Sequence, residues 1–192
     1  MALARGVCNV RAIMLKVGQA APAFTLHSTS GVEVSLASLK GKQVVLYFYP
    51  RDDTPGCTRE ACEFRDFDAR FKKCGAVVLG VSADNRAAHD KFRAKYKLPF
   101  DLLVDAGNEV AKKYGAHGEK TLYGKKVIGT IRSTFVIDAQ GKLAALWSKV
   151  KVDGHAEKVL AALNGVGIGG PSVVAPAKKT SAPKKKAAPR AQ

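Results

Sequence analysis

Two cysteines, Cys57 and Cys62, are the residues of this chain whose type and spacing best suit covalent chemistry. They lie in the stretch PRDDTPGCTREACEFRD, residues 50–66, which has helical periodicity from Cys57 onward. Backbone N–H groups and the positive end of the helix dipole converge at a first helical turn, so Cys57 lies where a nucleophilic thiolate is stabilised. We therefore expect Cys57 to be a reactive thiol.

The spacing of the two thiols argues against a permanent bond between them. In an ideal helix Cys62 is rotated by about 140° from Cys57. Their Cα atoms lie roughly 8–9 Å apart in that geometry, whereas a disulfide requires less than about 7 Å. A bond can form only if the first turns unwind, which suits a reversible, catalytic disulfide.

Other interpretations of the pair are possible from the local residues. Two unrelated cysteines on a surface helix would show the same pattern. A metal site is disfavoured because no second Cys or His pair follows at ligand spacing nearby. A thioredoxin-type dithiol needs C-x-x-C, and this motif is C-x-x-x-x-C.

The four cysteines are too few and too unevenly placed for the disulfide framework of a small secreted protein. We therefore expect a reducing compartment. Cys74 lies near the edge of the helical stripe of Phe64, Phe67 and Phe71, so we expect it to be a small buried hydrophobe. Cys8 is expected to be an idle thiol.

The elements that must position these thiols alternate between strands and helices. We expect a hairpin over 23–36, strands over 43–50, 76–82 and 100–105, and two strands within 131–150. We expect helices over 57–73, 85–97, 108–115 and 153–163, the last capped by Asp153. The pattern predicts an α/β domain with a thioredoxin-like fold, in which helices flank a mixed central sheet that follows an N-terminal β-hairpin.

The two ends of the chain differ from the body. We expect residues 1–14 to be a disordered extension, either the stub of a transit peptide or a segment upstream of a natural start at Met14. Residues 165–192 are rich in Lys, Ala and Pro and are expected to be a disordered tail after the 15–164 domain. Secretion and membrane spanning are both disfavoured, since the chain has no signal-peptide pattern and no long apolar run.

The chain resembles the peroxiredoxin Q, or bacterioferritin comigratory protein, group of thiol peroxidases over about residues 15–163. The matching stretches are KVGQAAPAFTL, VVLYFYPRDDTPGCTREACEFRD, LPFDLLVD, RSTFVID and GHAEKVL, in family order. One departure is His117, where many relatives carry a large aromatic residue before GEK; we expect it to be a loop residue.

The resemblance implies a role for each matching residue. Cys57 would be the peroxidatic cysteine and Cys62 the resolving one. Pro50 would shape the loop and shield the thiolate, Thr54 would steer the peroxide, and Arg132 would stabilise the thiolate and the leaving oxygen. Without the resemblance, Thr54 could equally be a helix-capping residue, and Arg132 could equally be an ordinary charged residue at the end of a strand.

The same resemblance carries two further roles. Glu60 matches an acidic position of the family and would anchor the loop, although an ordinary first-turn glutamate is equally plausible. Pro55 would help to shape the loop.

The implied activity is reduction of hydrogen peroxide and organic hydroperoxides through a Cys57 sulfenic acid and a Cys57–Cys62 disulfide. Thioredoxin or a similar dithiol would recycle the enzyme, which needs no metal and no bound cofactor. We expect a cytoplasmic monomer that does not contact membranes. Two alternatives remain: a nucleic-acid-associated protein that binds phosphates non-specifically through the basic tail, or a redox sensor that uses the same disulfide.

Overall fold

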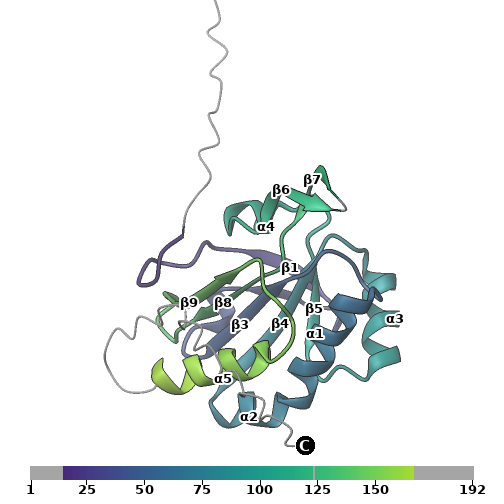
Figure 1. The fold of residues 1–192 in the computed structure, drawn as a ribbon. Coiled ribbons are helices and arrows are strands. Elements are labelled where there is room, and N and C mark those ends of the chain that lie inside the picture. The colour runs from purple at the N-terminus through teal and green to yellow at the C-terminus, as the bar shows by residue number, and fades with distance from the viewer. Residues whose placement is uncertain (1–14, 123, 167–192) are drawn as a thin grey trace, which may run out of the picture.

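A computed structural model describes residues 15–122 and 124–166 of the 192-residue chain. Its centre is a seven-stranded sheet with the order β2-β1-β5-β4-β3-β8-β9 (Figure 1). Strands β3, β4 and β5 are parallel, whereas β1, β8 and β9 pair antiparallel with their neighbours. The mixed sheet and the thioredoxin-like α/β fold predicted from the sequence are confirmed.

The strands are β1 (Thr25–Ser28), β2 (Glu33–Ser35), β3 (Gln43–Phe48), β4 (Ala76–Ser82), β5 (Asp101–Val104), β6 (His117–Leu122), β7 (Lys125–Thr130), β8 (Ser133–Ile137) and β9 (Leu143–Ser148). The helices are α1 (Pro55–Asp66), α2 (Asp68–Lys73), α3 (Arg86–Tyr96), α4 (Glu109–Lys113) and α5 (His155–Val166), with a 3-10 turn at Ala37–Leu39. None of the helices in the described part of the chain is both long and apolar enough to cross a membrane.

Strand β3 separates two hydrophobic cores because its side chains alternate between the faces of the sheet. Val45 and Tyr47 pack on one face, in the core covered by α1, α2, α3 and α5. Val44 and Leu46 pack on the other face, in the core that includes α4. All four side chains are buried, which explains why β3 is a continuous apolar run in the sequence.

Three local predictions were wrong. The helix expected over 57–73 is two helices, because Phe67 leaves helical geometry with φ −96° and ψ 0°. Asp153 does not cap α5; its carboxylate accepts from Arg59, and Glu63 of α1 accepts from the backbone N–H groups of Gly154 and Ala156. Helix α5 also continues through Gly165 to Val166, beyond its expected end.

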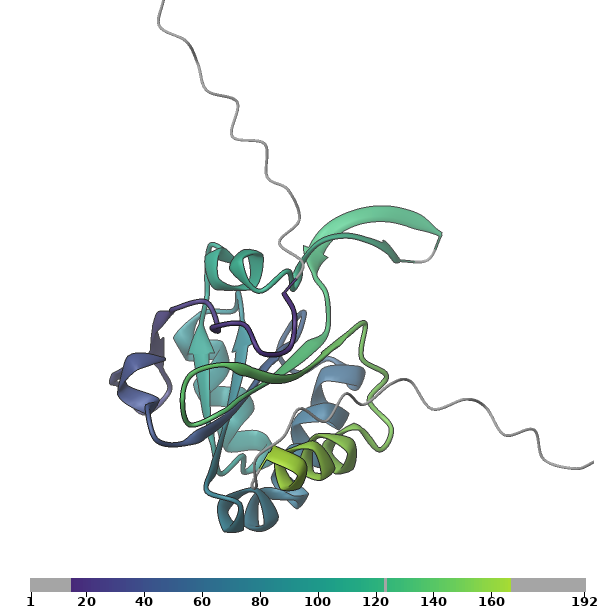
Figure 2. The same ribbon diagram turned by 90° about the vertical axis from the view of Figure 1, so that its left-hand side faces the viewer.

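A second hairpin, β6–β7, was not predicted. It forms a separate two-stranded sheet that projects from the body of the molecule, as Figure 2 shows. His117 is the first residue of β6 and therefore lies in a strand, not in the expected loop. The predictions for residues 1–14 and for the tail beyond residue 166 lie outside the described residues.

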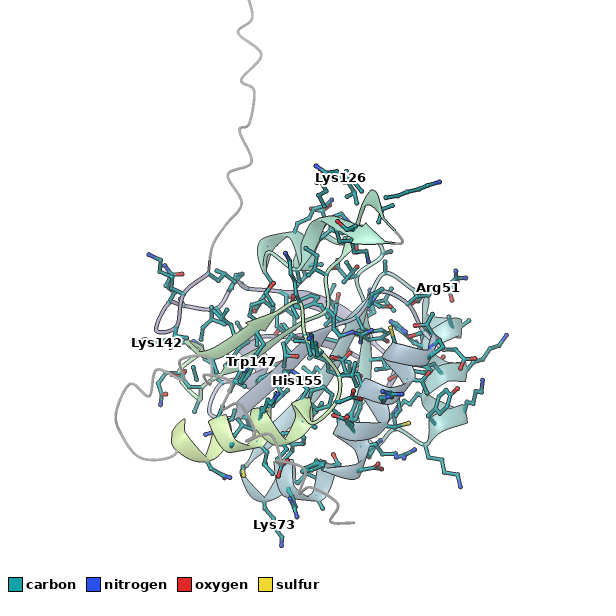
Figure 3. All side chains as sticks on the ribbon, viewed as in Figure 1. Arg51, Lys73, Lys126, Lys142, Trp147 and His155 are labelled. Atoms are coloured by element: carbon teal, nitrogen blue, oxygen red, sulfur yellow. The ribbon has the colours of Figure 1, made fainter. Side chains whose placement is uncertain are left out.

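His155 joins α5 to the sheet. Its ring is 3% exposed, and Nε2 lies 2.8 Å from Oγ1 of Thr134 on β8. Trp147 packs edge-on against the ring, and the two side chains lie next to each other in Figure 3. Burial, with the charges of Lys158 and Arg132, lowers the pKa of His155 to about 4.

The buried imidazole predicts a loss of stability in mild acid. The unfolded chain binds a proton at His155 near pH 6.5, whereas the folded chain resists it down to about pH 4. Burying the neutral ring is therefore favourable relative to protonation at neutral pH. As the pH falls from 6.5 to about 4, protonation of His155 in the unfolded chain should lower the free energy of unfolding by about 3 kcal/mol. Chemical denaturation of wild type and His155→Gln should show a stability difference that shrinks toward pH 4; a constant difference would contradict the prediction.

Candidate active site

Cys57 lies in the first turn of α1, buried beneath the loop that leaves β3. Only 2% of its surface is exposed. Thr54 is the N-cap residue and Pro55 the first helical residue, where a missing N–H costs nothing. The first backbone bond of the helix runs from Thr58 to Thr54, so the amides of Gly56 and Cys57 precede it. These amides give the sulfur a positive electrostatic environment.

Arg132, between β7 and β8, contacts the catalytic turn directly. Its Nη2 donates to Sγ of Cys57 at 3.2 Å, and its Nη1 donates to Oε2 of Glu60. A Cβ atom at Gly56 would lie 3.3 Å from Nη2, so a small residue at this position lets the guanidinium approach the helix. The fold thereby places the distant RSTFVID segment against Cys57.

Glu60 is 1% exposed and lies one helical turn after Cys57. Burial raises the pKa of Glu60 to about 7, although the charge of Arg132 opposes this shift. Its second oxygen, Oε1, is buried without a hydrogen-bond partner among the described residues. Arg132 therefore binds both Cys57 and Glu60, which lie one turn apart on the same face of α1. These two contacts attach the start of α1 to the sheet.

The remaining predicted site residues surround this turn at different depths. Pro50 is exposed and lines a cavity that also includes Arg132. Thr54 is partly buried; its Oγ1 donates to the carbonyl of Arg51 at 3.1 Å and makes no capping bond to α1. Its capping function therefore comes from its extended backbone, and its hydroxyl stabilises the loop before Cys57.

Cys62 lies on the same continuous helix, partly buried, and both thiols are free. The helical separation expected for the two Cα atoms therefore applies, and a bond between the sulfurs requires unwinding. Cys74 is partly buried rather than fully buried, and its Sγ lies 3.2 Å from Oδ1 of Asn164. Cys8 lies outside the described residues.

A buried polar cluster beneath the loop was missed by the sequence analysis. The carboxylate of Asp52 accepts from Tyr49 Oη at 2.7 Å and lies 2.7 Å from Nδ1 of His89. The side chains of His89 and Asp52 are 0% and 7% exposed. No motif could have shown this pairing, because the two residues belong to separate elements, the loop and α3.

Both ring nitrogens of His89 face oxygen atoms. Nε2 lies 3.2 Å from the carbonyl of Leu103, and Nδ1 lies against the Asp52 carboxylate. The geometry thus pairs a buried imidazole with a buried carboxylate.

Asp53 provides a second, exposed anchor. Its carboxylate accepts from Nζ of Lys95 at 2.7 Å and from Oη of Tyr96 at 2.6 Å, both on α3. Its φ of 53° lies in the left-handed region, which turns the chain toward α1. Two successive aspartates therefore fix the loop to α3 immediately before the catalytic turn.

The two anchors should differ in strength. His89→Leu leaves the buried Asp52 carboxylate without its imidazole partner, which should lower the free energy of unfolding by about 3–5 kcal/mol. Lys95→Ala breaks an exposed, solvent-screened pair and should cost far less. Denaturant unfolding of both variants measures the difference between the two losses of stability. The double variant Asp52→Asn/His89→Leu serves as a control, because it also removes the unpaired carboxylate. A His89→Leu cost no larger than that of Lys95→Ala would contradict a structural role for the buried Asp52–His89 pair.

Among the described residues, no group of three or more His, Cys, Asp or Glu side chains is placed to hold a metal ion. The donors around Cys57 are instead a guanidinium and backbone amides. This set can stabilise negative charge on a sulfur and on an oxygen beside it.

Comparison with known proteins agrees with this geometry. The model of the AhpC/TSA family matches residues 17–146, most of the chain. The chain belongs to the AhpC/TSA family. It is a thiol-dependent peroxidase of the peroxiredoxin Bcp/Q type, and this membership implies a hydroperoxide substrate and a thioredoxin-type reductant.

Relatives and solved structures span almost the whole described domain. The chain is 46% identical over 149 residues to peroxiredoxin Bcp of Bacillus subtilis, covering 78% of this chain and 95% of that protein. It is 47% identical over 133 residues to the chloroplastic peroxiredoxin Q of Oryza sativa subsp. japonica, covering 68% and 58%. The bacterioferritin comigratory protein of Xanthomonas campestris superposes with a TM-score of 0.73 at 39% identity, covering 78% and 98%.

Proposed function

We propose that this AhpC/TSA-family protein reduces hydrogen peroxide and organic hydroperoxides through Cys57, with Cys62 as the resolving cysteine. The contact of Arg132 Nη2 with Cys57 Sγ, at 3.2 Å in the first turn of α1, carries the proposal. It pairs the attacking sulfur with a permanent cation at the site where charge develops on the leaving oxygen.

The first step is attack of the Cys57 thiolate on one peroxide oxygen. The O–O bond breaks, the sulfur is oxidised to a sulfenic acid, and the departing oxygen takes a proton and leaves as water or an alcohol. Oxidation removes the negative charge from the sulfur and therefore weakens its interaction with Arg132. The start of α1 loses one of its two bonds to that guanidinium.

The second step closes the disulfide. Cys62 attacks the Cys57 sulfur as the helix start unwinds, an S–S bond forms, and the hydroxyl leaves as water after taking a proton. A thioredoxin-type dithiol then reduces the disulfide through a mixed disulfide, with Cys62, which is partly buried in the intact helix, as the sulfur that it attacks.

We also propose a monomeric, cytoplasmic enzyme. Both thiols belong to one helix, so the cycle needs no second chain.

Retention on DNA that vanished when residues 171–192 were deleted would instead support the nucleic-acid alternative.

Cys57→Ser should abolish peroxide consumption coupled to NADPH oxidation by thioredoxin and thioredoxin reductase, because serine forms no sulfenic acid. Cys62→Ser should still consume about one peroxide per chain but turn over poorly with thioredoxin. Cys74→Ser is the matched control and should retain wild-type turnover.

Two results would contradict the assignment. Peroxidase activity in Cys57→Ser would rule out Cys57 as the nucleophile. Full thioredoxin-dependent turnover in Cys62→Ser would show that another thiol resolves the sulfenic acid.

A further inference from the structure

Helix α1 is attached to the start of α5 by Arg59 and Glu63, which lie four residues apart and therefore share one side of the helix. Nη1 of Arg59 donates to Oδ1 of Asp153 at 2.7 Å. The N–H of Gly154 donates to Oε1 of Glu63 at 3.3 Å, and the N–H of Ala156 donates to Oε2 at 3.5 Å. We call these three contacts the α1–α5 latch. They join the helix that carries both thiols to a helix that the chemistry described so far does not use.

The α5 end of the latch is held by other parts of the fold. Helix α5 lies beside α1 on one face of the sheet (Figure 1), and Val159, Leu160 and Leu163 are buried in the core on that face. Nε2 of His155 lies 2.8 Å from Oγ1 of Thr134 on β8. The start of α5 is therefore attached to the sheet independently of α1.

The α1 end of the latch lies where the helix must unwind. Arg59 lies between Cys57 and Cys62, and Glu63 directly follows Cys62. In a regular α-helix the N–H of Glu63 donates to the carbonyl of Arg59, so both residues lose helical geometry when the segment between the thiols unwinds. This movement takes the Arg59 guanidinium away from Asp153 and the Glu63 carboxylate away from the amides of α5. Closing the disulfide therefore opens the latch.

The latch stabilises only the helical form of α1. The side chains of Arg59 and Asp153 are 65% and 81% exposed, so water and salt screen this pair and its contribution is small. Glu63 is half-buried, and its carboxylate lies at the positive end of the α5 dipole, where a negative charge is stabilising. The contacts are lost once α1 unwinds, so they oppose unwinding, and Glu63 opposes it more strongly than Arg59.

We propose that the α1–α5 latch sets the rate at which α1 unwinds after Cys57 has been oxidised. Arg59 and Glu63 are thus positioning residues for the resolving step. In that step the S–S bond forms as the S–O bond of the sulfenic acid breaks, and the hydroxyl leaves as water with the proton of the Cys62 thiol. The latch is closed in the reduced form and open in the disulfide form. This inference rests on the proposed peroxidase function and adds control of its second step.

Trp147 provides the signal for a test. It is the one tryptophan of the chain, and its ring packs edge-on against His155, the first residue of α5, as Figure 3 shows. Stopped-flow mixing of the reduced protein with hydrogen peroxide should give a first phase whose rate rises with peroxide concentration, from oxidation of Cys57. A second phase, independent of peroxide, should follow from formation of the disulfide. Mass spectrometry of quenched, thiol-blocked samples identifies the species in each phase.

Asp153→Asn should accelerate the second phase about twofold and Glu63→Gln about fivefold, because each weakens contacts that only the helical form makes. Both variants should leave the first phase unchanged. Asp153 lies outside α1, so its effect cannot arise from the helix propensity of α1 or from a charge next to Cys62. Damage to the fold would slow the first phase, whereas acceleration of the second phase alone indicates loss of a restraint.

Glu157→Gln is the matched control. Glu157 is exposed in the first turn of α5, and its substitution removes the same charge as Glu63→Gln. Both phases should keep their wild-type rates. An acceleration of the second phase equal to that of Glu63→Gln would assign the effect to net charge and overturn the latch.

Hydrogen exchange tests the opening of the latch without any substitution. In the wild-type protein the amides of Gly154 and Ala156 should exchange at least about tenfold faster in the disulfide form than in the reduced form, whereas the amide of Leu163 should be unchanged. Equal exchange in the two forms, or wild-type second phases in both Asp153→Asn and Glu63→Gln, would overturn the inference. Failure of hydrogen peroxide to oxidise Cys57 in the wild-type protein would instead contradict the proposed peroxidase function.

Discussion

The fork of Arg132 is the interaction on which the site depends. One arm donates to Cys57 and the other to Glu60, and both acceptors lie in the first two turns of α1. Loss of the negative charge on Cys57 or Glu60 weakens the hydrogen bond from Arg132 to the start of α1. The redox state of the sulfur and the stability of the helix start are therefore linked. The sheet supplies the rigidity, since Arg132 directly precedes β8, whose residues are all buried.

The loop before α1 complements this arrangement. Asp52 and Asp53 bind it to α3, one through the buried imidazole of His89 and one through exposed donors. The segment that must rearrange is therefore bounded by fixed points: the loop on one side and the Phe64 face of the helix on the other. In the proposed cycle, the rearrangement is confined to the turns that carry the two thiols.

Much of this organisation was predictable because it depends on local patterns. Continuous apolar runs identified β3 and β4, and the placement of Cys57 at a helix start led to its prediction as the nucleophile. Arg132 could be assigned only through the order of motifs in the resemblance, since nothing near it in sequence points to a thiol. The break at Phe67 was missed because Phe64 and Phe71 face the same core and the apolar stripe continues across it.

Features that depend on distant contacts could not be predicted. The β6–β7 hairpin has a mostly polar pattern and packs in neither core, so no hydrophobic alternation marks it. His89 and Asp52 are individually ordinary polar residues, and only the fold brings them together. The cap of α5 comes from Glu63 on another helix, which a search for a local capping residue cannot find.

The anchored loop also has a kinetic consequence. In the proposed cycle, the chain between Asp53 and Cys62 is short and fixed at its start, so an unwound α1 keeps Cys62 at a high effective concentration near the oxidised sulfur. A sulfenic acid survives against a second peroxide molecule only if the neighbouring thiol arrives first. In the proposed cycle, Asp52 and Asp53 limit how far the unwound helix moves and thereby protect Cys57 from irreversible over-oxidation.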